Sequence, residues 1–230
     1  MIVVFVHGAG CTGEIFAEQT AAFDGSIALT LPGHTTPGEP ASIEAFADAV
    51  SAELTSRALS DVVLCGHSMG GAIALELALR HEAPVRAVVM LSSGARLRVS
   101  PALLDAMERD FDRAARELPR NFFAEPSPAQ LAASTRMMLA VGQAQTLRDF
   151  RACDLFDRIS RLGEVTLPVL AVTGERDVLT PPKFAEALAD RIPGAAARIV
   201  PGAGHLAMAE RPGDVNDVLR TFVNHVVSSI

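Results

Sequence analysis

The sequence predicts an α/β fold with a mostly parallel central sheet that is flanked by helices. Short, almost wholly apolar runs recur along the 230 residues, which is typical of strands covered on both faces. Helical patterns lie between these runs, and 49% of the residues are apolar, enough to form one sizeable core. Strand and helix that alternate in this way imply right-handed crossovers, with ligands at the carboxyl ends of the strands.

Six apolar runs are the expected strands. They cover residues 2–6, 27–31, 62–65, 85–91, 169–172 and 197–200. Between and after them, residues 43–54 and 215–226 place apolar side chains at the three, four and seven spacing of one helix face. Together these patterns predict an α/β layer architecture.

The alternation fails between residues 96 and 164, where only helical patterns occur. One predicted helix opens with Ser127-Pro128-Ala129-Gln130, a capping box with proline at the first helical position, and ends near Gly142. We therefore expect a helical cap at 96–164, inserted into a core formed by residues 1–95 and 165–230. The alternative is that these helices are ordinary crossovers between strands.

Charge and the N-terminal segment restrict the partners. The formal net charge is −7 and no Lys/Arg block offers phosphate contacts, so we expect a small-molecule partner and no nucleic acid. Residues 1–6 are apolar, but they lack a basic leader and end at His7-Gly8, so we expect neither a signal peptide nor a membrane span. The protein is expected to be cytoplasmic, without a membrane partner, and a monomer or small homo-oligomer.

Cysteine usage and missing residue types restrict the chemistry. Cys11, Cys65 and Cys153 are odd in number and lack metal-ligand spacing, which favours small apolar filler over a disulfide framework or a zinc site. The chain has no Trp, no Tyr and a single lysine, Lys183, so Schiff-base chemistry and a phenol donor are nearly excluded. We expect no metal and no cofactor.

Residues 62–78 are typical of a strand, a tight turn and a helix. The turn is Gly66-His67-Ser68-Met69-Gly70, a G-x-S-x-G pattern. A serine at its apex takes a strained backbone conformation, and only glycines two residues to either side let strand and helix pass closely. Ser68 would then project above the sheet at a helix N-terminus, which favours developing negative charge. We expect Ser68 to be a nucleophile.

A serine hydroxyl is inert at neutral pH unless a base takes its proton and a carboxylate orients that base. His205 is the expected base, because it ends a Pro-Gly-Ala-Gly-His loop after the last predicted strand. His81 and His225 lie late on helices and are expected at the surface. His7 and His34 follow strands and are expected to be structural or pocket-lining.

The carboxylate is expected in the loop Thr173-Gly174-Glu175-Arg176-Asp177, which follows the preceding strand. Asp177 lies beyond the glycine and is the favoured acid, because the order serine, acid, histidine requires a carboxylate on this loop. Glu175 is the alternative acid.

The turn after the first strand, Val6-His7-Gly8-Ala9-Gly10, is an H-G-x-G pattern. Such a turn would aim the backbone N–H of Ala9 at the same point as the N–H of Met69, forming an oxyanion hole. A plain glycine turn is the alternative. It is disfavoured because the three elements follow three different strands in the required chain order.

Together these motifs resemble the α/β-hydrolase superfamily over nearly the whole chain: H-G-A-G, L-P-G-H at residues 31–34, G-H-S-M-G-G, G-E-R-D and G-A-G-H. In that family these positions are the oxyanion turn, the turn after the next strand, the nucleophile elbow, the acid loop and the histidine loop. The resemblance implies a serine esterase-like enzyme with the triad Ser68, Asp177 and His205.

The chain departs from the family in two places. It begins at what would be the family's third strand, so we expect a short form that lacks the first β-hairpin, as in methylesterase and hydroxynitrile-lyase relatives. The aspartate common before the L-P-G-H turn is also missing, with no carboxylate near Thr30. Any structural role of that aspartate must be met by another residue.

Within the family, the resemblance favours a carboxylesterase. Hydroxynitrile lyases of this architecture use a lysine near the histidine, and haloalkane dehalogenases use a nucleophilic aspartate and a tryptophan, all of which are absent from the matching positions. We expect a serine hydrolase that cleaves a small or medium uncharged carboxylic ester through an acyl-enzyme. A carbon–carbon bond hydrolase, a lactonase, a thioesterase and a catalytically weak small-molecule receptor stay open as alternatives.

The expected substrate pocket combines residues beside the two turns with apolar residues of the cap and the histidine loop. They are His7, Gly8, His67, Phe122, Phe123, Met137, Met138 and Leu206. Apolar residues at helical spacing are also typical of a core. Arg136, beside the methionines, is expected either to bind a substrate carboxylate or to face solvent. The His67 ring is expected to point to the other side of the turn from Ser68.

Overall fold

The protein is described by a computed structural model that places residues 1–35, 40–81 and 84–228. Six strands form one sheet in the order β2-β1-β3-β4-β5-β6, and every pair of neighbours is parallel. The strands are β1 (Ile2–Val6), β2 (Ile27–Leu29), β3 (Val62–His67), β4 (Val85–Leu91), β5 (Val169–Gly174) and β6 (Ala196–Val200). The predicted α/β fold with a parallel central sheet is confirmed.

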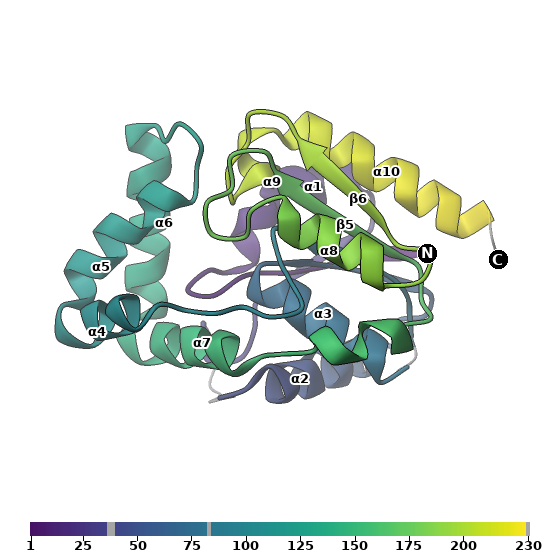
Figure 1. Cartoon of the computed structure of the whole chain (residues 1–230), viewed down its shortest axis with the longest axis horizontal. Helices are drawn as coiled ribbons and strands as arrows, with labels where there is room; N and C mark the ends of the chain where they lie inside the picture. Colours follow the sequence, from purple (N-terminus) through teal and green to yellow (C-terminus); the bar gives the residue numbers. More distant parts are fainter. Residues whose placement is uncertain (36–39, 82–83, 229–230) are drawn as a thin grey trace.

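Helices cover both faces of this sheet (Figure 1). On one face lie α2 (Ile43–Ser56), α3 (Met69–Leu79) and α8 (Lys183–Arg191). On the other face lie the 3-10 helix η1 (Gly13–Phe16) and helices α1 (Ala17–Ala22), α9 (Ala207–Glu210) and α10 (Pro212–Ser228). Alternate residues of a strand therefore enter different cores: Val4 and Val6 pack in one, Val3 and Phe5 in the other. None of the helices in the described ranges has the length and apolar character to cross a bilayer.

The predicted strand ends agree with the observed ends to within two residues. β2 stops two residues early because the N–H of Leu31 donates to the His7 ring at 3.0 Å and so leaves the sheet pattern. β6 lies at the edge of the sheet, where Arg198 is exposed and Ile199 is 37% exposed. The prediction that every strand is covered on both faces is wrong for β6, because the elements packed on the sheet leave consecutive side chains of this edge strand exposed.

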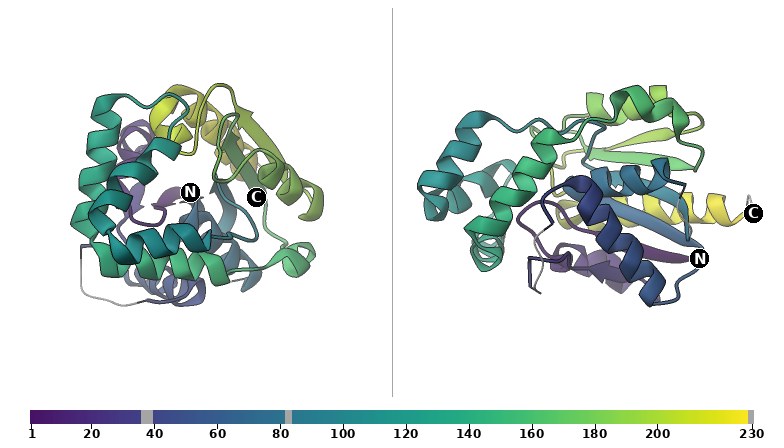
Figure 2. Two further views of the ribbon diagram at one scale, coloured as in Figure 1. Left: turned by 60° about the vertical axis from the view of Figure 1, so that its left-hand side comes forward. Right: turned by 90° about the horizontal axis from the view of Figure 1, so that it is seen from below.

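The segment between β4 and β5 is helical, as predicted. It contains α4 (Pro101–Arg109), α5 (Phe111–Glu117), η2 (Leu118–Asn121), α6 (Pro128–Val141), α7 (Gln143–Leu155) and η3 (Ile159–Glu164). The capping box opens α6, since the Ser127 hydroxyl and the Gln130 side chain each accept the other residue's N–H. Figures 1 and 2 show α4, α5 and α6 standing together at one end of the sheet. We call residues 96–164 the cap, and its division from the core as a domain stays a prediction.

The two ends of the cap meet beside the core. Arg96 and Asp157 form a single antiparallel bridge. The N–H of Arg158 donates to the carbonyl of Ala95 at 2.8 Å. These contacts hold the chain segments that enter and leave the cap next to each other.

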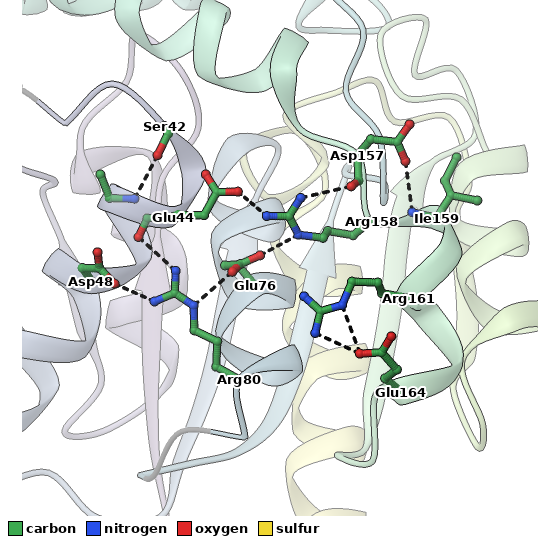
Figure 3. Close-up of polar contacts among 11 residues, drawn as sticks. Ser42, Glu44, Asp48, Glu76, Arg80, Asp157, Arg158, Ile159, Arg161 and Glu164 are labelled. Carbon is green, nitrogen blue, oxygen red and sulfur yellow. Dashed lines mark hydrogen bonds and ion pairs between the residues drawn. The ribbon is translucent and has the colours of Figure 1, made fainter.

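A chain of alternating charges fixes this junction to two core helices (Figure 3). The Arg158 side chain pairs with Glu76 on α3 at 2.8 Å and with Glu44 on α2. The Arg80 side chain also pairs with Glu76, at 3.0 Å, and with Asp48 on α2, at 2.6 Å. Ion pairs to α2 and α3 therefore hold the cap segment around Arg158 against the core.

Candidate active site

Ser68 lies where β3 turns into α3. Its backbone has φ +53° and ψ −113°, a positive-φ conformation that strains any residue with a side chain. A Cβ atom on Gly66 would lie 2.0 Å from the carbonyl oxygen of Gly70, and a Cβ on Gly70 would lie 2.1 Å from that of Val6. Glycine is required at both positions, and the predicted strand-turn-helix geometry is present.

His205 and Asp177 form a buried pair on the loops after β6 and β5. The Nδ1–H of His205 donates to Oδ2 of Asp177 at 2.9 Å. Because Nδ1 carries the proton in this hydrogen bond, Nε2 is the nitrogen left to accept one. Glu175 is exposed and accepts the N–H of Gly202 at 2.9 Å. The structure thus brings Asp177, and not Glu175, to the histidine.

The Asp177 carboxylate is held by its own loop. Its Oδ1 accepts the N–H groups of Leu179 and Thr180, both at 2.9 Å, and the Thr180 hydroxyl donates to Oδ2 at 2.7 Å. Burial by itself raises the pKa of Asp177, but the charge of His205 and the hydrogen bonds from His205 and Thr180 outweigh it and lower this pKa below its ordinary value. Thr180 was not among the residues predicted from the sequence, although a hydroxyl and N–H three residues after an aspartate are typical of an Asx turn.

The His67 ring lies on the same side of the turn as His205. Its Nε2–H donates to the backbone carbonyl of His205 at 3.1 Å, and the two rings are 4.7 Å apart. The expectation that the His67 ring points away from the site is therefore wrong, because the His205 carbonyl supplies an acceptor there. Burial and the charge of His205 lower the pKa of His67 well below its usual value, so this ring is neutral.

The glycine turn after β1 packs directly against the elbow. A Cβ atom on Gly8 would lie 2.8 Å from Nδ1 of His67 and 3.1 Å from Cβ of Ser68. Within the described ranges, the backbone N–H groups of Ala9 and Met69 form no hydrogen bond. Two unoccupied donors beside the serine are what an oxyanion hole requires.

One cavity of about 380 Å³ brings these groups together. Ser68, His205, Ala9 and His67 line it, which matches the expectation of a site at the carboxyl ends of the strands. Among the hydrogen bonds of the described residues, none joins the Ser68 hydroxyl to His205 Nε2. Catalytic hydrogen bonds of this kind often tighten only when substrate binds.

The rest of the cavity wall comes from segments that sequence analysis did not select. Residues 96–100 follow β4, residues 178–180 follow the acid loop, and Leu103, Leu118 and Phe150 come from the cap. For residues 178–180, their position directly after the predicted acid was the one sequence signal that could have placed them in the cavity wall. Arg96 and Arg98 lie on this wall, whereas Arg136 is exposed and does not line the cavity.

The predicted pocket residues divide between two cavities. His67, Phe122 and Leu206 line the cavity that contains Ser68. Phe123, Met137 and Met138 line a neighbouring cavity of about 270 Å³, whose wall also includes Phe122, Leu206 and Cys11. The structure therefore brings the methionines near the site but not to Ser68.

His7 and Gly8 line neither cavity. His7 is fully buried: its Nδ1–H donates to the Gly8 carbonyl at 2.9 Å, and its Nε2 accepts the N–H of Leu31. Burial and the nearby His34 lower the pKa of His7 to about 3, so the ring is neutral. With both nitrogens occupied, His7 has a structural place in the fold. His81 and His225 are exposed, as predicted.

Other nucleophiles near the cavity are disfavoured. All three cysteines are free and buried, and Cys11 and Cys153 line the cavity. Burial raises the pKa of the Cys11 thiol to about 12 and raises that of Cys153 as well, so both stay protonated and weakly nucleophilic. Ser93 donates its hydroxyl to the Ser68 carbonyl at 2.7 Å. Among the described residues, no group of three His, Cys, Asp or Glu side chains is placed to hold a metal ion.

Comparisons with known proteins agree with the fold. Residues 3–218 match the family described as the alpha/beta hydrolase family. The pimeloyl-[acyl-carrier protein] methyl ester esterase of Neisseria meningitidis serogroup A is 29% identical and aligns over 98% of this chain and 77% of its own length. The solved structure of a thermophilic esterase is 29% identical, with a TM-score of 0.89 over 97% of this chain and 90% of its own. An N-acyl homoserine lactone degrading enzyme, Est816, is also 29% identical, with a TM-score of 0.86 over 96% of this chain and 93% of its own.

Proposed function

The chain belongs to the alpha/beta hydrolase family, and we propose that it is a serine esterase that cleaves a small or medium-sized carboxylic ester through an acyl-enzyme. The observation that carries this proposal is the 2.9 Å hydrogen bond between His205 and Asp177, because His205 and Ser68 line the same cavity. An imidazole with a carboxylate on one nitrogen, next to a strained serine, is suited to activate that serine as a nucleophile.

In the first half of the reaction, Ser68 Oγ attacks the ester carbonyl carbon and its proton passes to His205 Nε2. The carbonyl oxygen becomes an oxyanion, which the N–H groups of Ala9 and Met69 stabilise; one such donor is typically worth about 3 kcal/mol. Asp177 keeps the proton on His205 Nδ1 and stabilises the imidazolium. The carbon–oxygen bond to the alcohol then breaks, and the alcohol leaves with the proton from Nε2.

In the second half, His205 takes a proton from water, and the hydroxide oxygen attacks the acyl carbon of the Ser68 ester. The same two N–H groups hold the second oxyanion. Collapse returns the proton from Nε2 to Ser68 Oγ and releases the carboxylic acid. Each cycle converts one ester and one water into one acid and one alcohol.

Size and wall chemistry support a medium acyl chain as the substrate. A cavity of about 380 Å³ lies at the lower end of the range of about 300 to 1,000 Å³ that encloses small ligands. Most of its side-chain lining is apolar, from Leu97 and Leu103 to Phe122 and Phe150. The Neisseria relative is a methyl ester esterase by name. We therefore propose a methyl or other small-alcohol ester of a medium-length acyl chain.

Lactone hydrolysis is the second candidate function. It is supported by the likeness to an N-acyl homoserine lactone degrading enzyme over 96% of the chain. A lactone is an internal ester, so the same steps apply, except that the alcohol stays attached to the acyl group.

A panel of substrates tests both candidates. We expect kcat/KM for nitrophenyl esters to peak at about four to eight acyl carbons, because longer chains overfill the cavity. Dimethyl pimelate and an N-acyl homoserine lactone, measured beside them, separate methyl ester from lactone hydrolysis. Highest activity on palmitate would contradict the substrate proposal, and absence of turnover on every ester and lactone would contradict the proposed function.

A further inference from the structure

Asp149 is a fully buried carboxylate that the catalytic steps above do not use. It lies on cap helix α7, and its side chain has no exposure to solvent. A buried carboxylate is costly unless hydrogen bonds satisfy its oxygens. Its partners therefore show what it holds in place.

Three donors from three segments converge on this carboxylate. The backbone N–H of Gly10 and Nε2 of His34 both bond Oδ2 at 2.9 Å. The side-chain amide of Gln145, one helical turn earlier on α7, donates to Oδ1 at 2.8 Å. Gly10 belongs to the turn after β1, and His34 to the turn after β2. The carboxylate thus joins the cap to both turns.

The Gly10 hydrogen bond acts on the backbone of the turn that carries Ala9. Gly10 has φ +64°, and a Cβ atom there would lie 3.2 Å from Thr146 and 3.6 Å from Met138, both in the cap. The peptide between Ala9 and Gly10 is therefore fixed from the cap side by a hydrogen bond and by packing. The N–H of Ala9 is one peptide earlier in the same turn.

We propose that Asp149 is a positioning residue for the oxyanion turn. It acts through the Gly10 N–H and sets the direction of the Ala9 N–H toward the developing oxyanion. The inference rests on the proposed function, because the turn holds an oxyanion only if Ser68 attacks an ester. A misplacement of about 1 Å at such a group can cost about 100-fold in rate.

The contact between Asp149 and His34 also supplies a carboxylate to the L-P-G-H turn, which lacks the aspartate common in the family. Near Thr30 the chain has no acidic residue, yet His34 of this turn meets a carboxylate, supplied by α7. Its other ring nitrogen lies 3.3 Å from the Pro32 carbonyl, and the His7 ring packs across it at 4.5 Å. An acid from the cap thus serves the turn that lacks one of its own.

The test compares Asp149→Ala with Asp149→Asn, which keeps one acceptor oxygen. With nitrophenyl butyrate, we expect Asp149→Ala to lower kcat at least about tenfold with KM within about twofold, because a transition-state contact is lost and ground-state binding is not. Asp149→Asn should lose less kcat. Gln143→Ala is the matched control: this exposed residue opens α7 and bonds the end of α4, away from the turn. It should behave as wild type.

Hydrogen exchange at the Gly10 amide gives a readout that does not need activity. We expect exchange to accelerate in folded Asp149→Ala and to stay unchanged in Gln143→Ala, because only the first removes the acceptor. Wild-type kcat in folded Asp149→Ala would overturn the inference and leave the esterase proposal standing. Should the alanine variant not fold, wild-type kcat in an Asp149→Asn variant whose Gly10 amide exchanges faster than in wild type would do the same. If the wild-type protein hydrolyses no ester and is not labelled by a fluorophosphonate, the esterase proposal and this inference both fail. Hydrogen exchange at Gly10 then shows only whether the hydrogen bond to Asp149 is present.

Discussion

At the scale of single residues, the buried polar groups of the site are of two kinds. Some are hydrogen-bonded within the protein and hold the loops, and others line the cavity. His7, His34 and Asp149 have their ring or carboxylate atoms bonded within the protein. Ser68 and His205 line the cavity instead. Pairing of these three residues is what a preorganised site requires, because their side chains then need not reorient during the reaction.

The proposed acid, Asp177, gives a prediction at this scale. Asp177→Asn should lower kcat by about 10³ to 10⁴, because an amide no longer fixes the proton on His205 Nδ1. Glu175→Gln, two residues away on the same loop, should leave kcat close to wild type, since Glu175 bonds Gly202 and not the histidine. Steady-state kinetics with a nitrophenyl ester checks both. If Glu175→Gln were the damaging change, the acid would have to be reassigned.

The residues that sequence analysis found and those it missed differ in one physical respect. Ser68, Asp177 and His205 each follow a strand within a recognisable glycine turn, so local chain geometry predicts where they lie. The pairing of His7 with the Leu31 N–H depends on how two strands lie side by side, which no local pattern records. Asp149 is 115 residues from His34 and lies inside an ordinary helix, and only the folded cap brings it to the turn.

At the scale of elements, the junction between cap and core depends on Arg158. This arginine and Glu76 are mostly buried, with side chains 18% and 6% exposed, and Arg158 also pairs with Glu44 (Figure 3). Arg161, three residues later, pairs only with Glu164 in Figure 3, and these side chains are 41% and 54% exposed. The chain thus offers two ion pairs in one short segment that differ in burial.

Substitution of each arginine should separate their contributions to stability. Arg158→Ala removes one of the two arginines that pair with the buried Glu76, leaving only Arg80, and should lower the free energy of unfolding by about 1.5 to 3 kcal/mol. Arg161→Ala removes a solvated pair and should change it by less than about 1 kcal/mol. Urea unfolding followed by circular dichroism measures both. Equal effects would show that the junction is not held by this network.

The bounds of helices and strands were predictable where a local sequence pattern sets them. Features that depend on a strand's place in the sheet were less predictable. The capping box at Ser127 fixed the start of α6, and apolar runs located the six strands to within two residues. The exposure of β6 was not predicted, because an apolar run does not record where its strand lies in the order of the sheet, and β6 is the last strand in that order. Which strand is an edge strand follows from that order alone.

At the scale of the whole molecule, the buried histidines make stability depend on pH. The pKa of His7 is lowered to about 3 by burial and by His34, against about 6.5 in an unfolded chain. Between these values the unfolded chain binds a proton that the folded protein does not, so stability rises with pH and is fully present above about 6.5. His67, whose pKa is also lowered, acts in the same direction. The lowered pKa of Asp177 adds a loss of stability as the pH falls below about 4.

We therefore expect the free energy of unfolding to fall on acidification from pH 7.5 to 5. Each buried neutral histidine contributes a slope of up to about 1.4 kcal/mol per pH unit below about pH 6.5. Urea unfolding at several pH values measures this slope, and His7→Gln should reduce it by removing one titrating group. A free energy that stays constant or rises over this range would contradict the burial of neutral histidines.

The central claim is that Ser68 is the nucleophile, and covalent labelling tests it most directly. The protein is treated with a fluorophosphonate, digested and mapped by mass spectrometry, with Ser68→Ala as the parallel sample. We expect one adduct, on the peptide that carries Ser68, and no label on folded Ser68→Ala. An adduct on Ser92, Ser93 or Cys11, or equal labelling of the Ser68→Ala variant, would contradict the account.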